Sequence, residues 1–150
     1  MSTITWLHIS DLHWRPEWAY DENVVAQALL RDLKERDRIS PDLGQIDFCF
    51  VTGDLAYSGQ VNEYISVESF LRELVDVTGI KQDHLFVVPG NHDVNWGLVD
   101  EPTSEIVKGL ADRQAVNTLL GDDPQRALVL KRFDPYRGLV NRYLKHIPFD

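Results

Sequence analysis

The first hundred residues alternate between short, densely apolar runs and longer amphipathic segments. The apolar runs cover residues 4–9, 46–52 and 85–88, and they are rich in β-branched and aromatic side chains, as buried strands are. Because polar residues rarely interrupt these runs, we expect the strands to be covered on both faces, as in a parallel sheet.

The two amphipathic segments predict helices between the strands. Asp21 can cap a first helix, which should end near residues 37–39, before Ser40-Pro41. A second helix is expected over residues 62–77, with Gly79 as its C-cap. The apolar positions at helical spacing are Val25, Ala28, Leu29 and Leu33 in the first helix and Val67, Phe70, Leu71 and Leu74 in the second.

Strand, helix, strand, helix and strand in this order form two βαβ units. They predict an α/β fold with a parallel-rich sheet and covering helices. Later in the chain, residues 105–120 and 125–133 look helical, with breakers at 121–124 and 134–135. We therefore expect one domain with a motif-bearing core over about residues 3–97 and a helical segment over 101–146.

Composition narrows the classes of protein to which the chain can belong. Its 150 residues are 43% hydrophobic and 26% charged, as in an ordinary globular domain. No apolar run approaches the roughly 20 residues that span a bilayer, and the first residues lack the features of a secretory signal. Cys49 is the single cysteine, so no disulfide can form within the chain and we expect a reducing, cytoplasmic setting.

The net charge of −9 is concentrated in residues 1–100, which hold 17 acidic and 7 basic side chains. Such a surface binds a long phosphate backbone poorly by itself. It does attract divalent cations, which would reverse the local sign. Charge alone does not separate this interpretation from simple solubility.

Polar clusters stand at the ends of all three predicted strands. They read Asp11-Leu-His13, Gly53-Asp54 and Gly90-Asn91-His92-Asp93. Ligands of open α/β sheets bind at the carboxyl ends of strands, so these clusters should converge although they are far apart in the sequence. Mixed oxygen and nitrogen ligands suit Mn²⁺, Fe, Zn²⁺ or Ni²⁺ better than Ca²⁺. Each cluster alone could be a turn or a helix cap, and their joint occurrence is what predicts a metal site.

The three clusters resemble the opening blocks of the calcineurin-like metallophosphoesterase family, over residues 3 to about 97. The resemblance implies the first portion of a four-layer α/β-β/α sandwich and two divalent metal ions, with Mn²⁺ favoured and Fe, Zn²⁺ or Ni²⁺ as alternatives. It also implies that Asp11 and His13 bind one metal, that Asp54 bridges both, and that Asn91 binds the second.

The same resemblance gives the last two motif residues a part in the reaction. His92 would protonate the leaving group or stabilise the transition state, and Asp93 would orient His92, while a hydroxide bridging the metals attacks the phosphorus in line. No arginine follows Asp54 closely, and the third block ends in Asp93. Both features are similar to the bacterial phosphodiesterase-like branch, which acts on cyclic nucleotides, nucleic-acid ends and other diesters.

The later histidine blocks of the family have no match here. The only histidine after His92 is His146, and no Gly-His pair occurs in the sequence. By analogy about three imidazole ligands are missing, so metal binding should be weak or leave water-filled positions. We expect the chain to be the N-terminal portion of one metallophosphoesterase domain, with further domains or another chain supplying the missing ligands.

Aromatic residues beside the motifs are candidates for binding substrate. Trp14 and Trp96 could each stack on a base, and Tyr57 could contact substrate or shape a turn. Burial in the core is an equal alternative for Trp14 and the favoured one for Trp6.

The remaining histidines favour structural roles: His8 in the core, His84 at the surface or in a turn, and His146 as a structural residue rather than a late ligand. The basic side chains between residues 126 and 145 could guide an anionic substrate or bind a partner. A solvated helical face is the favoured alternative.

Two functions of different classes fit these features. The first is metal-dependent hydrolysis of phosphate esters, above all phosphodiesters such as cyclic nucleotides or nucleic acid. The alternative is a non-catalytic regulatory or interaction module that retains a partial metal site within a larger multidomain protein. The expected partner is a phosphate-ester substrate, which could be a nucleotide or a nucleic acid. Binding to a membrane is not expected.

Overall fold

The computed structural model describes residues 3–15 and 23–149 and contains a parallel sheet in the order β1-β2-β3. The strands are β1 (Trp6–Ile9), β2 (Phe48–Thr52) and β3 (Leu85–Val88). Leu7 lies opposite Cys49 in the first pair, and Val51 lies opposite Val87 in the second. The predicted parallel α/β architecture is confirmed, although β1 and β2 each begin two residues later than expected.

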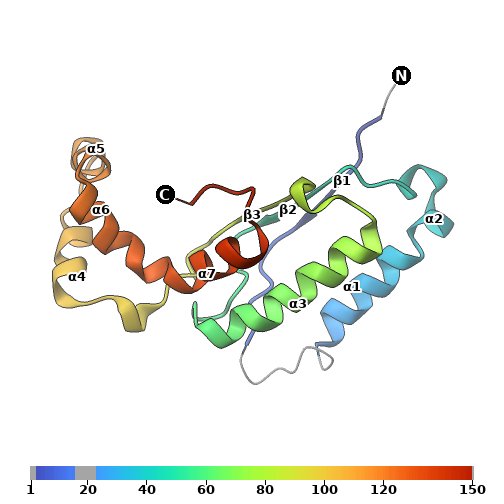
Figure 1. Cartoon of the computed structure of the whole chain (residues 1–150), viewed down its shortest axis with the longest axis horizontal. Helices are drawn as coiled ribbons and strands as arrows, with labels where there is room; N and C mark the ends of the chain where they lie inside the picture. The colour runs from blue at the N-terminus through green and yellow to red at the C-terminus, as the bar shows by residue number, and fades with distance from the viewer. Residues whose placement is uncertain (1–2, 16–22, 150) are drawn as a thin grey trace.

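Two crossovers connect the strands, and their long helices lie on the same face of the sheet (Figure 1). The first crossover holds α1 (Val24–Lys34), α2 (Arg36–Ile39) and η2 (Pro41–Leu43), and the second holds α3 (Val61–Thr78) and η3 (Gln82–His84). Right-handed crossovers that both step in the same direction along a sheet place their helices on one face. Both α1 and α7 (Asp134–Tyr143) pack against α3.

The first helix differs from the prediction in its cap and in its buried side. Asn23 caps it, because its side chain accepts a hydrogen bond from the backbone N–H of Ala26, and Asp21 lies outside the described residues. Val25, expected on the buried side, is 79% exposed. The side chains that face the core are Ala26, Leu30 and Leu33.

The second helix agrees with the prediction. Gly79 ends α3 with a left-handed φ of 72°, which glycine adopts without steric cost. At the other end, the Glu63 side chain accepts the backbone N–H of Gln60. The expected apolar face is buried, with Val67, Phe70, Leu71 and Leu74 all in the core.

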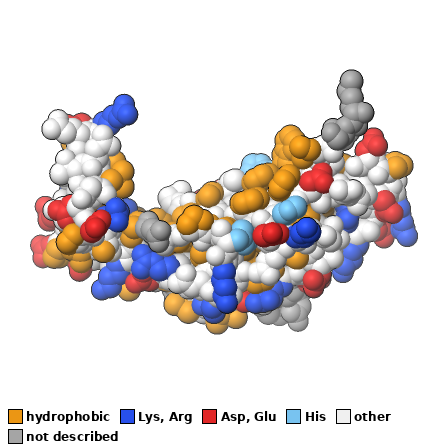
Figure 2. Space-filling view, turned by 45° about the horizontal axis from the view of Figure 1, so that its top comes forward, with side chains coloured by type: hydrophobic (Ala, Val, Ile, Leu, Met, Phe, Trp, Pro, Cys, Tyr) orange, Lys and Arg blue, Asp and Glu red, His pale blue; other side chains and the backbone are white. Residues whose placement is uncertain are grey.

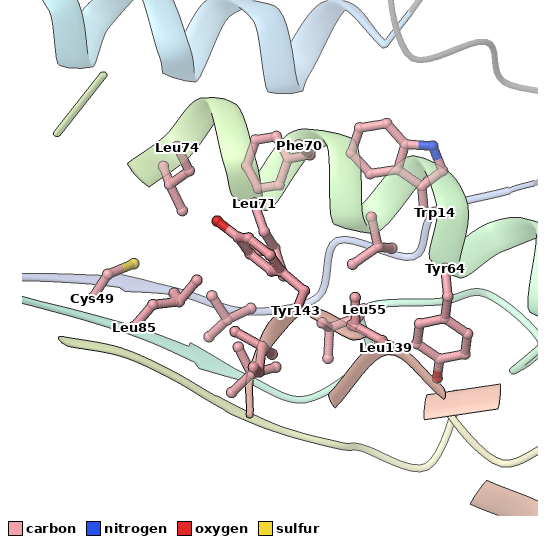
Figure 3. Close-up of a cluster of buried hydrophobic side chains, with 14 of the residues drawn as sticks. Trp14, Cys49, Leu55, Tyr64, Phe70, Leu71, Leu74, Leu85, Leu139 and Tyr143 are labelled. Atoms are coloured by element: carbon pink, nitrogen blue, oxygen red, sulfur yellow. The ribbon is translucent and has the colours of Figure 1, made fainter. Parts of the chain in front are cut away.

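The core lies between one face of the sheet and the helices α1, α3 and α7, and Figure 3 shows part of it. Cys49 of β2 is fully buried there, and burial raises the pKa of its thiol to about 12. The thiol therefore stays protonated at neutral pH and behaves as a small apolar side chain.

The opposite face of the sheet has no cover from any described helix, so the prediction of burial on both faces is wrong. Trp6 is 62% exposed, Phe86 39% and Val88 51%, and Figure 2 shows hydrophobic side chains gathered with histidines on this side. Trp6 and His8, both expected in the core, lie here, and a 2.6 Å hydrogen bond joins His8 Nε2 to Thr52 Oγ1. The apolar density of the strands does not reveal where a second covering layer comes from.

The chain after β3 forms short helices rather than the two long ones expected. They are η4 (Trp96–Leu98), α4 (Glu101–Lys108), α5 (Arg113–Gly121), α6 (Asp123–Leu130) and η5 (Lys131–Phe133), and α7 follows them. Helices α4 to α6 form an arm to one side of the sheet (Figure 1). Within the described residues, no helix combines the length and the apolar character that crossing a membrane requires.

Two local signals explain these differences in the second part of the chain. The predicted helix over 105–120 is interrupted, because Asp112 starts a new helix by accepting the backbone N–H of Ala115. Asp134-Pro135, expected only as a breaker, begins α7, since proline fits the first turn of a helix.

Candidate metal centre

Backbone hydrogen bonds continue the pairing of β1 and β2 into the loops that follow them. Three N–H groups of the first loop donate to carbonyl oxygens of the second, at 3.3, 2.8 and 2.9 Å: Asp11 to Gly53, His13 to Asp54, and Trp14 to Leu55. The Gly53 N–H in turn donates to the Val88 carbonyl oxygen at the end of β3 (3.0 Å). The ends of the three strands therefore meet, as the sequence predicted.

His13, Asp54 and His92 form what we call the strand-end cluster, with one nitrogen or oxygen atom of each within 4.8 Å of the others. His13 Nε2 lies 3.7 Å from Asp11 Oδ1 and 3.9 Å from Asp54 Oδ2. These separations are too long for hydrogen bonds. They fit two ligands of a single ion, each about 2.0–2.2 Å from it.

The backbone is strained at three of the four predicted ligands. Asp11, His13 and Asp54 have φ angles of 58°, 46° and 52°, and they are the non-glycine residues with positive φ in the described parts of the chain. Such conformations cost of the order of 1–3 kcal/mol each and gather at functional sites. The strain therefore falls on three of the residues that the sequence predicts to bind metal.

Asp54 is held close to the third loop, in a space that only glycine leaves open. Its Oδ1 accepts a hydrogen bond from the backbone N–H of His92 (2.9 Å). A Cβ atom at Gly90 would lie 2.2 Å from that same Oδ1 and 2.6 Å from the Asp54 nitrogen. The glycine that precedes Asn91 is thus required by the approach of Asp54.

Changing Gly90 to alanine is therefore expected to displace Asp54 and to weaken Mn²⁺ binding by at least about tenfold, the usual cost of disturbing the support of a ligand. Isothermal titration calorimetry of the folded variant measures this. Gly121→Ala is the matched control, because a Cβ there meets nothing within 4 Å. Equal Mn²⁺ affinity in the two variants would show that Asp54 does not need the space at Gly90.

Asp93 is fully buried and connects the loop after β2 to the loop after β3. Its Oδ1 accepts the backbone N–H of Ala56 (3.0 Å) and the Tyr64 hydroxyl (2.7 Å). Its Oδ2 accepts the backbone N–H groups of Leu55 (3.2 Å) and Gly90 (2.8 Å). Burial and the neighbouring Asp93 raise the pKa of Tyr64, so that hydroxyl stays protonated and donates.

The ring of His92 is oriented by a different group from the one expected. Its Nδ1 lies 2.8 Å from the backbone carbonyl oxygen of Tyr57. A carbonyl can only accept, so Nδ1–H is the donor and Nε2 is the nitrogen left for chemistry. Asp93 instead accepts hydrogen bonds from backbone N–H groups and from Tyr64. It can therefore influence the orientation of His92 only indirectly, by fixing the loop that contains Tyr57.

The three aromatic candidates occupy different positions. Trp14 is fully buried and packs on Phe70, with ring centroids 5.6 Å apart, so it occupies the core, which was one of the two positions expected for it. Tyr57 is 41% exposed, and its ring centroid lies 5.7 Å from that of His92. Trp96 is exposed in η4, and its contact with substrate stays a prediction.

The two remaining polar candidates, Asn91 and His146, lie at opposite ends of the sheet. Asn91 is exposed beside the strand-end cluster, and its role as a ligand stays a prediction. His146 Nε2 lies 2.7 Å from the carbonyl oxygen of Leu85, at the start of β3 and hence at the end of the sheet opposite the cluster. This bond supports the structural role expected for His146.

Two features of the site were not predicted from the sequence. The guanidinium carbon of Arg15 lies 4.0 Å from the centre of the Tyr57 ring, and the signal for it is the position of Arg15 two residues after His13. A mainly apolar pocket with a volume of about 580 Å³ opens beside Asp11 and His13. It lies between the end of β1 and the start of α1.

Comparison with known proteins agrees with this geometry. The family model for calcineurin-like phosphoesterase matches residues 4–146, so the helical segment after residue 97 lies within the match as well. The chain is 34% identical over 147 residues to the uncharacterized metallophosphoesterase-like protein YydB of Bacillus subtilis (strain 168), an alignment that covers 91% of this chain and 28% of that protein. The chain thus spans less than a third of the length of this relative. From the family match and the strand-end cluster together it follows that the chain belongs to the calcineurin-like phosphoesterase family.

Proposed function

We propose that this chain carries the metal-binding part of a hydrolase of phosphate esters, and of phosphodiesters in particular. The observation that carries the proposal is the strand-end cluster, in which two imidazoles and a carboxylate from three separate loops come within 4.8 Å of one another. Membership of the calcineurin-like phosphoesterase family supports metal-dependent phosphoester hydrolysis. The organic part of the ester would occupy the pocket beside Asp11 and His13.

Four side chains would hold two divalent ions: Asp11, His13, Asp54 and Asn91. The separations of His13 from both carboxylates fit shared ligation, and Asp11 is 65% exposed and open to substrate. When bound, such ions polarise phosphoryl oxygens and lower the pKa of bound water. The mixture of nitrogen and oxygen ligands favours Mn²⁺, with Fe, Zn²⁺ or Ni²⁺ as alternatives.

His92 would exchange a proton with the leaving group through Nε2. Its Nδ1–H donates to the Tyr57 carbonyl oxygen, which sets the tautomer and the plane of the ring. The rings of His13 and His92 are nearly perpendicular, with centroids 4.5 Å apart. His92 is thus held next to the site where a phosphoryl group would bind.

We also propose that the missing histidine ligands come from outside these 150 residues, either from further domains of the same protein or from another chain. The exposed face of the sheet supports this, because Trp6, Phe86 and Val88 offer a large apolar surface for a second layer. The absence of a Gly-His pair favours one second candidate, a non-catalytic module that keeps a partial metal site. A cytoplasmic setting stays a prediction from the single cysteine.

Removing metal separates these two functions. Protein treated with EDTA should lose hydrolysis of bis(4-nitrophenyl) phosphate, and added Mn²⁺ should restore it more fully than Zn²⁺ or Ni²⁺. The diester should also be cleaved faster than 4-nitrophenyl phosphate. The assay is run on this chain and on the protein with the sequence that follows it. No activity in either sample would favour the non-catalytic module, and activity that resists the chelator would contradict a metal-dependent reaction.

A further inference from the structure

Glu63 is a buried carboxylate at the start of α3 that has no part in the reaction described so far. It is fully buried and accepts three hydrogen bonds from the segment that precedes the helix. Its Oε2 accepts the backbone N–H groups of Ser58 (3.2 Å) and Gln60 (2.8 Å), and its Oε1 accepts the Ser58 hydroxyl (2.9 Å). A helix cap accounts for the bond to Gln60 but not for the two bonds to Ser58.

One of these bonds involves the peptide group that orients His92. The carbonyl of Tyr57 and the N–H of Ser58 are the two ends of one trans peptide bond, which is planar and points its C=O and N–H in opposite directions. The carbonyl oxygen accepts Nδ1–H of His92 (2.8 Å), while the N–H donates to Glu63 Oε2 (3.2 Å). A single rigid plane thus connects the carboxylate to the imidazole.

The chain is fixed on both sides of this peptide group. Before it, the backbone N–H of Tyr57 donates to the Trp14 carbonyl oxygen (2.9 Å). After it, Gly59 has a φ of 66° and packs so closely on the loop after β3 that a Cβ there would lie 2.7 Å from the Asp93 carbonyl oxygen. The bonds to Glu63 therefore act on the rotation of the peptide plane between these two fixed points.

The same contacts affect the charge distribution along this path. Hydrogen bonds that follow one another polarise each other, so a carboxylate at the N–H end makes the carbonyl at the other end a stronger acceptor. That carbonyl holds the proton on Nδ1 of His92. When Nε2 gives its proton to the leaving oxygen, as the bond from that oxygen to phosphorus breaks, the ring becomes neutral in the tautomer that the carbonyl stabilises.

We propose that Glu63 is a positioning residue for His92 and acts through the peptide group between Tyr57 and Ser58. The proposal rests on the function proposed above and adds a residue that lies outside the predicted ligands. Glu63 acts behind the reacting groups. Its loss should therefore slow proton transfer to the leaving group and leave Mn²⁺ affinity unchanged.

The tautomer of His92 tests the proposal without any need for turnover. Two-bond proton–nitrogen NMR correlations of the metal-free chain distinguish protonated from unprotonated ring nitrogens, at a pH high enough for imidazole to be neutral. The signals of His92 are those that His92→Gln removes. The unmodified chain should show Nδ1–H alone, and Glu63→Ala should show a mixture of both tautomers. Glu63→Gln should keep Nδ1–H, because its amide oxygen can replace Oε2 and its NH₂ group can donate to the Ser58 hydroxyl.

Hydrolysis of esters with two different leaving groups gives a second readout. Phenoxide is a stronger base than 4-nitrophenoxide, so its departure depends more on protonation. Glu63→Ala should lower kcat for diphenyl phosphate by about tenfold, a fraction of what a general acid contributes, and kcat for bis(4-nitrophenyl) phosphate by less. The KM values should stay within about twofold, because binding of the ground state is not affected. Glu63→Gln should recover most of the loss.

Thr78→Ala is the matched control, because it removes a buried oxygen at the other end of α3, where Thr78 Oγ1 donates to the Leu74 carbonyl oxygen (2.6 Å). It should lower the unfolding midpoint without changing the tautomer or the ratio of the two kcat values. Glu63→Asp keeps the charge and shortens the side chain by one methylene group. It should show the same mixture to a smaller extent, and it decides the question where Glu63→Ala does not fold.

Two results would overturn the proposal: Nδ1–H alone in folded Glu63→Ala or Glu63→Asp, or the same change of tautomer in Thr78→Ala. A tautomer that depends on Glu63 in a protein that hydrolyses no ester would support the positioning role and contradict the proposed function. Hydrolysis by a protein in which neither the tautomer nor the effect of the leaving group depends on Glu63 would overturn the positioning role alone.

Discussion

Replacing Asp93 by alanine is expected to lower the free energy of unfolding by about 3–5 kcal/mol, a large part of the stability of a domain of this size. The carboxylate is fully buried and accepts four hydrogen bonds, three from backbone N–H groups and one from Tyr64. Alanine would leave four donors without an acceptor, three of them in buried hydrogen bonds and the Gly90 N–H in a partly buried one. Each buried loss costs about 1–3 kcal/mol before the loops relax. The loops that carry Asp54 and His92 would lose their common support.

Urea denaturation followed by circular dichroism measures this loss. Tyr64→Phe removes one of the four donors and should cost only about 0.5–1.5 kcal/mol. Asp76→Ala, at an exposed position of α3, is the control for loss of a carboxylate and should change stability by about 0.5 kcal/mol or less. A free energy of unfolding for Asp93→Ala within about 1 kcal/mol of that of the unmodified chain would show that Asp93 does not stabilise these loops.

The second large effect is expected for Asp54→Asn, which should reduce metal-dependent hydrolysis by more than a hundredfold. Disturbing the support of a metal ligand already costs about 10–100-fold, and Asp54 is proposed to be a ligand of both ions. Asparagine keeps the shape of the side chain, and its carbonyl oxygen can still accept the His92 N–H that Asp54 Oδ1 accepts at 2.9 Å. The fold should therefore survive the change.

Turnover of bis(4-nitrophenyl) phosphate and the thermal unfolding midpoint are compared for Asp54→Asn and Asp83→Asn. The control makes the same change in charge at an exposed residue of η3, at the opposite end of β3. Turnover retained in both variants would remove Asp54 from the reaction. A lowered unfolding midpoint for Asp54→Asn alone would point to a structural role instead.

The elements that could be predicted from sequence are those whose local signals agree with their tertiary setting. In α3 the apolar spacing and Gly79 both indicate the same helix, and the structure has it within one residue at each end. The convergence of Asp11, His13 and Asp54 followed from their positions just after predicted parallel strands, because such strands end at one edge of a sheet. Their left-handed backbone could not be read from sequence, since it depends on how the loops pair.

The errors concern burial, which depends on which parts of the chain pack against each other. Trp14 and Trp6 are both tryptophans near the first strand, yet Trp14 is fully buried and Trp6 is 62% exposed. The difference arises because α3 covers one face of the sheet and no described helix covers the other. For the same reason the role of Asp93 was assigned to the wrong partner, because sequence proximity to His92 does not reveal the four donors around the carboxylate.

The claim that the strand-end cluster is a metal site is tested most directly by titrating the folded 150-residue chain with Mn²⁺ and following free Mn²⁺ by electron paramagnetic resonance. We predict saturable binding by the unmodified chain that Asp54→Asn weakens by at least about tenfold, while Asp83→Asn leaves it unchanged. Equal binding by all three proteins, or none by the unmodified chain, would contradict a metal site formed by His13, Asp54 and their neighbours.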